Sequence, residues 1–325
     1  MSGCIRNFAS SFVLALALVS GQQATATEAW PQQTVRIVVP FPAGSAIDVA
    51  ARIIGDGLAI RWGRSVVIEN KAGGETVIGA AAFANSRDDH ALLYTTFGTL
   101  SILPLTADKL PFDPQRDLVP LVPTVSVVVA VSVTSDLAVK TLADLETIIR
   151  ARPGELAWAS SPTLPRYVFT MFLKQRHLEM TYVAYRDASQ PQADLSEGRI
   201  HAFIAAIPTS TPAVAAGKAR FVATTEPQRT TILPEVPSVA EAGYDELTFV
   251  GGAGMFGSKN MPSSVRERII TDVNAVLSDA VVAGKLRAAG QQVIGGGPEA
   301  LRRLVEQQTA RVVEISKSID LKSAR

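Results

Sequence analysis

The residues with the clearest capacity for binding chemistry follow the β-branched run Val35–Val39. Pro42 and Gly44 shape a turn there, and Ser45 and Asp48 have the spacing of a capping box, which predicts that a helix begins at Ser45. In one interpretation these residues only turn the chain and cap the helix. In the other, unpaired amides and the positive end of the helix dipole form an anion site. The loop alone leaves both interpretations open.

Three further segments favour the anion site. They are "TTFGTLS" (95–101), "WASSPTLPRYV" (158–168) and "VAYRDAS" (183–189), and each follows a strand-like run. In open α/β sheets, ligands bind beyond the carboxyl ends of the strands. The hydroxyls, amides and aromatic rings gathered there suit a small polar anion, and they offer no nucleophile with a matching base.

The sequence lacks the common catalytic motifs, which argues against an enzyme. His90, His177 and His201 stand far apart, and the sequence contains no HExxH, GxSxG or GxxxxGK[ST] motif. Residues 252–257 match GxGxxG formally, but residues 258–262 separate them from the next helix, so the pyrophosphate geometry of a dinucleotide site is not expected. We therefore expect no catalytic residue, no metal and no cofactor.

The elements that must position these loops alternate between strand-like and helix-like patterns. This alternation predicts an α/β protein built from βαβ units, with mainly parallel sheets covered by helices on both faces. The expected strands are Val35–Val39, Ser65–Glu69, Ala91–Thr96, Val125–Val133, Leu156–Ala159, Thr181–Ala184, Ala202–Ala206, Arg220–Thr224 and Leu247–Phe256.

Two strand-like stretches, 120–133 and 246–257, are expected to cross between two lobes. The first lobe would comprise residues 27–128 and 248–325, and the second, inserted lobe would comprise residues 129–247. Crossing strands of this kind act as a hinge for closure of a cleft. After the second crossing, Pro262 and the spacing of Ser264 and Glu267 predict a helix start. Two helices, split at residues 295–298, would complete the chain.

Composition bounds the class of protein. The chain has 325 residues, 47% of them hydrophobic, with 31 Lys and Arg against 30 Asp and Glu. This balance gives no basic excess for nucleic acid. Residues 1–26 carry Arg6, an apolar run at 12–19 and the cleavage pattern Ala24-Thr25-Ala26, which predict a signal peptide and export to the periplasm. Cleavage would remove Arg6 and the only cysteine, Cys4, leaving a net charge of zero and no thiol for a disulfide or metal site.

Several segments in this order resemble the tripartite tricarboxylate transporter substrate-binding proteins, also called Bug or TctC-like receptors. They are "WPQQTVRIVVPFPAGSAIDVAAR", "VVIENKAGG", "KLPFDPQRDLVPL", "KTLADL", "WASS", "AAGKARFVATT" and "LPEVPSVAEAGY". The resemblance implies a type II periplasmic-binding fold, in which two doubly wound lobes close on a small organic carboxylate held by backbone amides and bridging waters. It also implies a monomer whose partner is a membrane transporter or a sensor kinase, with no role for nucleic acid.

The resemblance also implies the ligand-binding residues. Gly44, Ser45 and Ala46 would present amides to the carboxylate, Asp48 would cap the helix and hold a water, and the second lobe would add hydroxyl donors. The full set is Phe41, Ala43, Gly44, Ser45, Ala46, Asp48, Thr96, Phe97, Thr99, Ser160, Ser161, Thr163, Tyr185, Arg186, Asp187, Pro208 and Thr209.

Departures from the family pattern bear on the ligand. Ser45 replaces a glycine, Phe97 replaces a small residue, and Pro162 and Pro165 stiffen a segment that is usually polar. An apolar wall and a stiff loop favour an aromatic or branched acid, although Phe97 could also pack against the helix behind it. Asp187 replaces a glycine, and its role as a cap or as an ion-pair partner is open.

Two alternatives remain at this point. An exported enzyme on the same fold would need a titratable pair in the cleft, such as Asp48 with Asp187 or with His201. An adaptor would use the two lobes only for contact with another protein.

Overall fold

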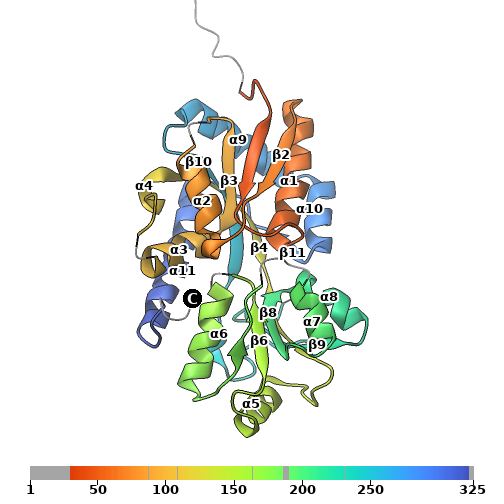
Figure 1. Ribbon diagram of the computed structural model, residues 1–325. Helices are drawn as coiled ribbons and strands as arrows, with labels where there is room; N and C mark the ends of the chain where they lie inside the picture. The colour runs from red at the N-terminus through yellow and green to blue at the C-terminus, as the bar shows by residue number, and fades with distance from the viewer. Residues whose placement is uncertain are drawn as a thin grey trace, which may run out of the picture.

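The computed structural model describes residues 30–86, 88–107, 109–162, 164–185, 190–230 and 232–321. The signal peptide expected at residues 1–26 lies outside these residues. The described strands form two sheets, one above the other in Figure 1, with helices packed around each. Among the helices of the described ranges, none combines the length and apolarity needed to span a membrane.

The first sheet contains six of the described strands. β1 pairs in parallel with β2 and β3, whereas β10 runs antiparallel to β3 and β4, and β11 runs antiparallel to β4. From edge to edge the strands are β11 (Gln291–Val293), β4 (Leu118–Val127), β10 (Gly251–Ser258), β3 (Ala91–Thr96), β1 (Val35–Val39) and β2 (Val66–Asn70).

The second sheet contains five of the described strands and repeats the same winding. β6 is parallel to β7 and β8, while β5 is antiparallel to β8 and β9. From edge to edge these strands are β7 (Thr181–Tyr182), β6 (Ala157–Ser160), β8 (Ala202–Ala206), β5 (Val129–Thr134) and β9 (Ala219–Thr224). In each sheet, the strand that enters from the other lobe runs antiparallel to both of its neighbours. This strand is β10 in the first sheet and β5 in the second. The expected α/β class with two doubly wound lobes is therefore confirmed. The expectation of mainly parallel sheets is wrong, because five of the nine pairings between described strands are antiparallel.

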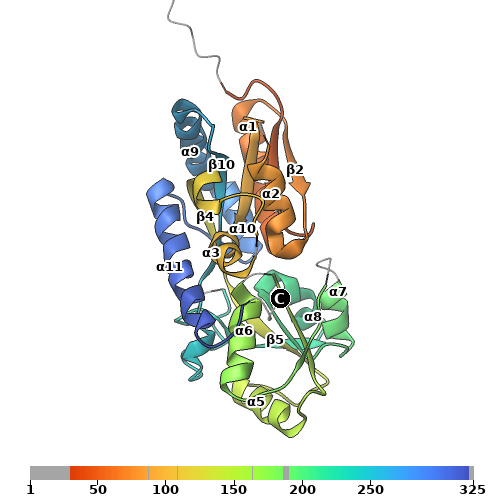
Figure 2. The ribbon, with the colours of Figure 1, turned by 60° about the vertical axis from the view of Figure 1, so that its left-hand side comes forward.

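Side-chain alternation along the strands explains why helices cover both faces of each sheet. On β1, Val35, Ile37 and Val39 belong to the cluster under α1, whereas Val38 belongs to the cluster on the opposite face. β8 divides in the same way, with Ile204 in one cluster and Phe203 in the other. Figure 2 shows the helices of the first lobe on either side of its sheet.

The helices of the first lobe are α1 (Ala46–Trp62), the 3-10 turn η1 (Gly74–Thr76), α2 (Val77–Ala84), α3 (Phe97–Thr106), α4 (Pro114–Asp117), α9 (Ser263–Leu277), α10 (Ala280–Ala288) and α11 (Pro298–Ser316). Those that follow strands of the second sheet are α5 (Leu142–Ala151), α6 (Leu164–Gln175), α7 (Gln190–Ser196), α8 (Ile207–Ala215) and the 3-10 turn η2 (Asp245–Leu247).

Three expectations about the elements were wrong. The run 125–133 is two strands, β4 and β5, because the chain passes from one sheet to the other at Val128. The C-terminal part has three helices and β11 instead of two helices, since Asp279 caps a new helix by accepting hydrogen bonds from two amides after α9 ends. The capping box at Ser264 is also absent, because α9 begins at Ser263 with Pro262 as its N-cap and no side-chain bond.

The last helix connects the two lobes. Leu301, near its start, packs in a cluster with residues of α2 and α3, while Val312 and Ile315 belong to the core under the second sheet. Ile319 and Leu321, just beyond the helix, belong to that second core as well. The lobe boundaries given above stay a prediction, and α11 shows that the C-terminal segment contacts both lobes.

Candidate functional site: a cleft between the two sheets

A cleft of about 130 Å³ lies between the two lobes, where the strands of both sheets end and the chain crosses between them. Residues from both sheets and from both crossing segments line it, and most of them are apolar. They are Phe41, Pro42, Ser45, Ala46, Ile47, Thr96, Gly98, Val127, Val129, Ser160, Ser161, Pro162, Leu164, Pro165, Tyr185, Pro191, Phe203, Ala206, Thr209, Gly251, Gly252 and Gln308.

The loop before α1 supplies the first wall of this cleft. Ser45 is the N-cap, and its hydroxyl accepts a hydrogen bond from the Asp48 amide. The Gly44 amide donates to Asp48 Oδ2 at 2.9 Å, and the Ser45 amide donates to the Pro42 carbonyl at 3.2 Å. The role expected for Gly44 and Ser45, with amides open to a ligand, is therefore not what the structure has. The next two amides, of Ala46 and Ile47, make no hydrogen bond within the described residues, and both residues line the cleft.

Asp48 positions this loop instead of facing the cleft. The residue is 2% exposed, and Asn70 Nδ2 donates to its Oδ1 at 2.8 Å while Arg52 Nε donates to its Oδ2 at 2.9 Å. Burial raises the pKa of Asp48, but the hydrogen bonds from Arg52, Gly44 and Asn70 together hold that pKa below its usual value. The carboxylate thus stays charged and keeps the turn in place.

A contact that the sequence did not indicate fixes the first turn of α1. Gln291, on β11, donates from Nε2 to the Ala46 carbonyl at 2.6 Å in a buried position. The two residues are 245 positions apart, so no local pattern could have predicted the pairing.

The loop after β3 contributes Thr96 and Gly98 to the cleft. Thr96 caps α3 by accepting a hydrogen bond from the Thr99 amide. Buried Thr99 Oγ1 accepts a hydrogen bond from Thr95 Oγ1 at 2.8 Å and contacts Thr96 Oγ1 at 3.2 Å. Phe97 is 2% exposed and packs in the core, where its ring fills the space that a Cβ on Gly252 would need. Phe97 therefore supports the wall of the cleft from behind, and Thr99 acts as part of a helix cap.

The second lobe brings Ser160, Ser161, Tyr185 and Thr209 to the opposite wall. The Ser161 amide extends the strand pairing by donating to the Ile204 carbonyl at 2.9 Å. Ser160 Oγ lies close enough to Tyr182 to influence its pKa, but it makes no hydrogen bond of normal geometry with a described residue. The Tyr185 ring lines the cleft while its hydroxyl donates to Asp194 Oδ2 at 2.6 Å, so the ring offers an apolar surface.

Some predicted site residues lie elsewhere. Ala43 and Gly44 are exposed and outside the lining, and Pro208 meets the first lobe at Gly290, where an added Cβ would lie 2.8 Å from the Pro208 Cγ. The predictions for Thr163, Arg186 and Asp187 fall outside the described residues.

The floor of the cleft was missing from the sequence prediction. Val127 and Val129 reach it from the first crossing, Gly251 and Gly252 from the second, and Phe203 from β8. The glycines were visible as a run, and the structure explains them, because a Cβ on Gly251 would come within 2.5 Å of the Val127 carbonyl. The formal GxGxxG sequence is thus part of β10 and not a phosphate loop.

Gln308 enters the floor from α11. Its Nε2 donates to the Val250 carbonyl at 3.1 Å, and its Oε1 is buried with no hydrogen-bond partner among the described residues. Of the lining residues that the structure describes, none carries a formal charge. The cleft therefore combines an apolar surface with a few neutral polar groups.

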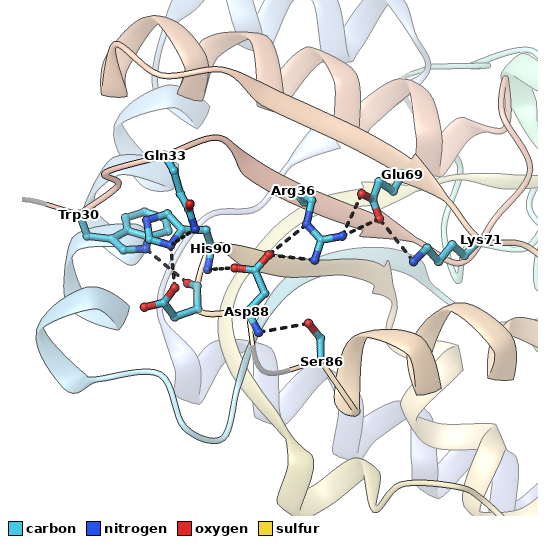
Figure 3. Close-up of polar contacts among 9 residues, drawn as sticks. Trp30, Gln33, Arg36, Glu69, Lys71, Ser86, Asp88 and His90 are labelled. Atoms are coloured by element: carbon cyan, nitrogen blue, oxygen red, sulfur yellow. Dashed lines mark hydrogen bonds and ion pairs between the residues drawn. The ribbon is translucent and has the colours of Figure 1, made fainter.

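Charged groups concentrate away from the cleft, along β1 and β2. Figure 3 shows Arg36 between Asp88 and Glu69, with His90 beside Trp30 and Gln33 at the amino ends of β1 and β3. His201 is also remote, since its Nδ1 accepts a hydrogen bond from the Ala157 amide at the amino end of β6. Asp48 and His201 are therefore not brought together as an acid–base pair.

The two similarly wound sheets, the crossing strands and the cleft between them define a type II periplasmic-binding architecture. The model of the Tripartite tricarboxylate transporter family receptor matches residues 50–321, and the chain belongs to this family.

Similar proteins include one from Pseudomonas sp. (strain P51), described as the UPF0065 protein in the tcbD-tcbE intergenic region, with 31% identity over 92% of this chain and 90% of its own length. Protein BugT of Bordetella pertussis is 26% identical over 87% of this chain and 88% of its own. The solved structure of R. palustris Rpa4515 with adipate is 31% identical, covers 89% of this chain and 98% of its own, and superposes with a TM-score of 0.84. The resemblance to the Bug and TctC-like receptors is thus confirmed.

Proposed function

We propose that this protein captures a small organic carboxylate with an apolar body in the periplasm and leaves it chemically unchanged. The observation that carries this proposal is the composition of the cleft: its described lining is uncharged and mostly apolar, and it includes Ala46 and Ile47, whose amides make no hydrogen bond within the described residues. A carboxylate is the charged group that such amides bind best, because the helix dipole places partial positive charge there.

The chemistry of binding follows from the two walls. The ligand carboxylate would accept hydrogen bonds from the first turn of α1 and from neighbouring hydroxyls, of which Thr96 and Thr209 stand on opposite walls. The body of the ligand would lie against Phe41, Phe203 and Val129, each at most 5% exposed. Burial of a ring or branched chain there contributes about 25 cal/mol per Å² of apolar surface. An aromatic, branched or aliphatic acid fits this lining better than a compact polyacid such as citrate.

The relative from R. palustris agrees with this class of ligand, since adipate is a carboxylate with an aliphatic chain. An acid–base role is disfavoured by the positions of two residues. Asp48 is bound by Arg52 and Asn70, and His201 lies at the amino end of β6, the end opposite the cleft. Because the family takes its description from a transporter, we infer that the loaded monomer delivers its acid to a membrane transporter and not to a sensor kinase.

The test combines a thermal-shift screen of organic acids with calorimetric titration of the hits. A ligand present at 100 times its Kd raises the free energy of unfolding by about 2.7 kcal/mol. We expect hits among monocarboxylates and dicarboxylates with apolar bodies. Recovery of the acid with its mass unchanged after long incubation is expected, and a converted acid would contradict binding without chemistry.

Ser45→Asp is the decisive variant. Aspartate is as good an N-cap as serine, so the helix is expected to keep its stability, yet a negative charge would stand at the wall where the ligand carboxylate binds. We expect affinity for the acid to fall by about 100-fold, which is 2.7 kcal/mol. The matched control is Thr141→Asp, at the N-cap of α5 in the second lobe and outside the cleft lining, and it should leave binding unchanged. Equal affinity of the Ser45→Asp variant and the wild type would refute the assignment of this loop.

A further inference from the structure

One ion pair joins the two lobes beside the cleft. Glu75 lies in η1, between β2 and α2 of the first lobe, and Arg166 lies in the first turn of α6, which follows β6 of the second. Arg166 Nη1 donates to Glu75 Oε1 at 2.6 Å, and the two side chains are only 9% and 18% exposed. Leu164 and Pro165, just before Arg166, line the cleft, so the pair stands at its rim.

The backbone that carries Glu75 is held in an unusual conformation. Gly73, Gly74, Glu75 and Thr76 have φ values of +123°, +55°, +53° and +79°. Glycine adopts such values at little cost, but Glu75 and Thr76 lie in the left-handed region that costs L residues about 1–3 kcal/mol each. Strain of this size persists only where the surroundings fix it, and here its effect is to hold the Glu75 carboxylate against the other lobe.

Arg166 is fixed from its own side. Its guanidinium carbon lies 4.2 Å above the centre of the Tyr182 ring, a cation–π contact within the second lobe. Glu75 Oε2 is buried with no partner among the described residues. Arg166 is thus the cation that pairs with this carboxylate in the described part of the chain. A buried carboxylate that loses its cation is strongly destabilised, whereas separation of the lobes would return both groups to water.

We propose that the Glu75–Arg166 pair is a clamp that stabilises the closed arrangement of the two lobes before any ligand binds. This proposal rests on the proposed function in one respect, namely that closure of the lobes serves to capture the acid. The clamp raises the fraction of molecules whose cleft is already assembled, and apparent affinity scales with that fraction. Arg166 thus acts on the closed state and not as a contact for the ligand carboxylate.

The clamp is tested without any acid by measuring the distance between the lobes. Spin labels at Ala82→Cys on α2 and Lys174→Cys on α6 occupy exposed positions on opposite lobes, with Cys4→Ser removing the only native cysteine. In this background Glu75→Gln is expected to lower the ratio of closed to open molecules by about tenfold, as for loss of one buried ion pair at an interface. The distance distribution should shift toward longer values.

Glu146→Gln is the matched control. Glu146 is 17% exposed, close to the 18% of Glu75, and pairs with Arg150 of the same helix at 2.8 Å. Its other partners, Arg176 and the Tyr244 hydroxyl, also belong to the second lobe. Loss of that pair lies within one lobe, so the distance distribution should not move. A shift as large as that of Glu75→Gln would overturn the proposal, because it would show a general effect of lost charge.

A double-mutant cycle makes the test independent of folding defects. Arg166→Gln alone should open the lobes as Glu75→Gln does, and the double variant should add little to either. Additive effects, or unchanged distances in all three, would overturn the clamp. Failure of the proposed function looks different: if no acid binds but Glu75→Gln still opens the lobes, the clamp stands and only the ligand class is wrong.

Discussion

The polar residues along β1 and β2 differ from those of the cleft in charge and in how fully they are hydrogen-bonded. Along the strands, Arg36 donates to both Asp88 and Glu69, and each charge meets an opposite one (Figure 3). In the cleft, Ser160 Oγ and Gln308 Oε1 are neutral, buried and without a normal hydrogen bond among the described residues. Buried polar atoms are usually satisfied, and these two line the proposed binding cleft, where a ligand could supply the missing hydrogen bonds. Dense, paired charge marks the first region, whereas sparse neutral groups line the cleft that we propose as the binding site.

The edge position of β2 explains the charge along the strands. β2 ends the first sheet, and an edge strand with charged side chains resists pairing with another chain. Burial raises the pKa of Asp88, but the His90 amide and Arg36 outweigh it and hold that pKa below its usual value. For Glu69, Arg36 likewise outweighs burial and lowers the pKa.

The largest effect that should separate the two regions comes from Arg36→Gln. It leaves two partly buried carboxylates without their shared cation, so we expect a loss of about 2 kcal/mol in the free energy of unfolding at pH 7 and no change in acid binding. Because both folded pKa values are depressed, the stability that Arg36 provides is present above the unfolded pKa values and is lost as the pH falls through the folded ones. Urea titrations from pH 7 to pH 3 measure this.

The control for Arg36 is Arg152→Gln, which breaks an exposed pair with Glu155 and should cost less than about 0.5 kcal/mol. Equal losses in the two variants, or weaker acid binding in Arg36→Gln, would break the comparison between the regions.

Glu226 should give a smaller effect with the opposite dependence on pH. It follows Thr225, which hydrogen-bonds to both crossing segments, at Val129 and Phe249. Burial raises the pKa of Glu226 to about 7, and its Oε1 has no partner within the described chain. Between pH 4.5 and 7 the folded state binds the proton and the unfolded state does not, so stability falls as the pH rises.

We therefore expect Glu226→Gln to raise the free energy of unfolding by about 1 kcal/mol at pH 8, with almost no gain at pH 4. Urea titrations of variant and wild type at the two pH values give the difference directly. The control is Glu235→Gln on the exposed loop after β9, which should show no such dependence. A gain that is the same at both pH values would show that desolvation of the charge is not the cause.

The smallest effect on stability is expected from Ser160→Ala. Since this hydroxyl makes no normal hydrogen bond with a described residue, its removal should change the free energy of unfolding by less than about 0.5 kcal/mol, while affinity for the acid falls about fivefold.

The matched site is Ser132, whose Oγ donates to the Phe203 carbonyl at 2.9 Å and contacts Ser210 Oγ at 2.7 Å. Ser132→Ala should cost about 1 kcal/mol and leave binding unchanged. Denaturation and titration of the two variants sharpen the comparison, and the reverse pattern would contradict it.

Sequence reasoning located the strands of the core because they are short, apolar runs bounded by turns. β1, β3 and β8 have the predicted bounds, whereas β11 has three residues and gives no alternation that could be recognised. The spacing of Ser45 and Asp48 correctly predicted the cap of α1, but not that the Asp48 carboxylate would take the Gly44 amide. That outcome depends on Asn70 and Arg52, which hold the carboxylate from other parts of the fold.

The walls of the cleft were easier to predict than its floor. Loops at strand ends carry their polar residues in consecutive positions, so Ser45, Thr96 and Ser160 could be found from local patterns. Gln308 and Phe203 reach the floor only because a distant helix and a central strand pack there. In the sequence, Phe203 cannot be distinguished from a core residue, and Gln308 cannot be distinguished from a surface residue of a helix. Phe97 shows the same limit, since the sequence left open whether it faces the cleft or packs behind it, and the structure places it one layer behind.

The path of α11 limits how far the two lobes of the receptor can separate. This helix starts against the first lobe and finishes in the core of the second, so it acts as a third tether beside the two crossing strands. Any rotation of one lobe relative to the other has to bend α11 or separate its last turns from the core of the second lobe. The ligand-free and ligand-bound forms should therefore differ by only a small rotation between the lobes.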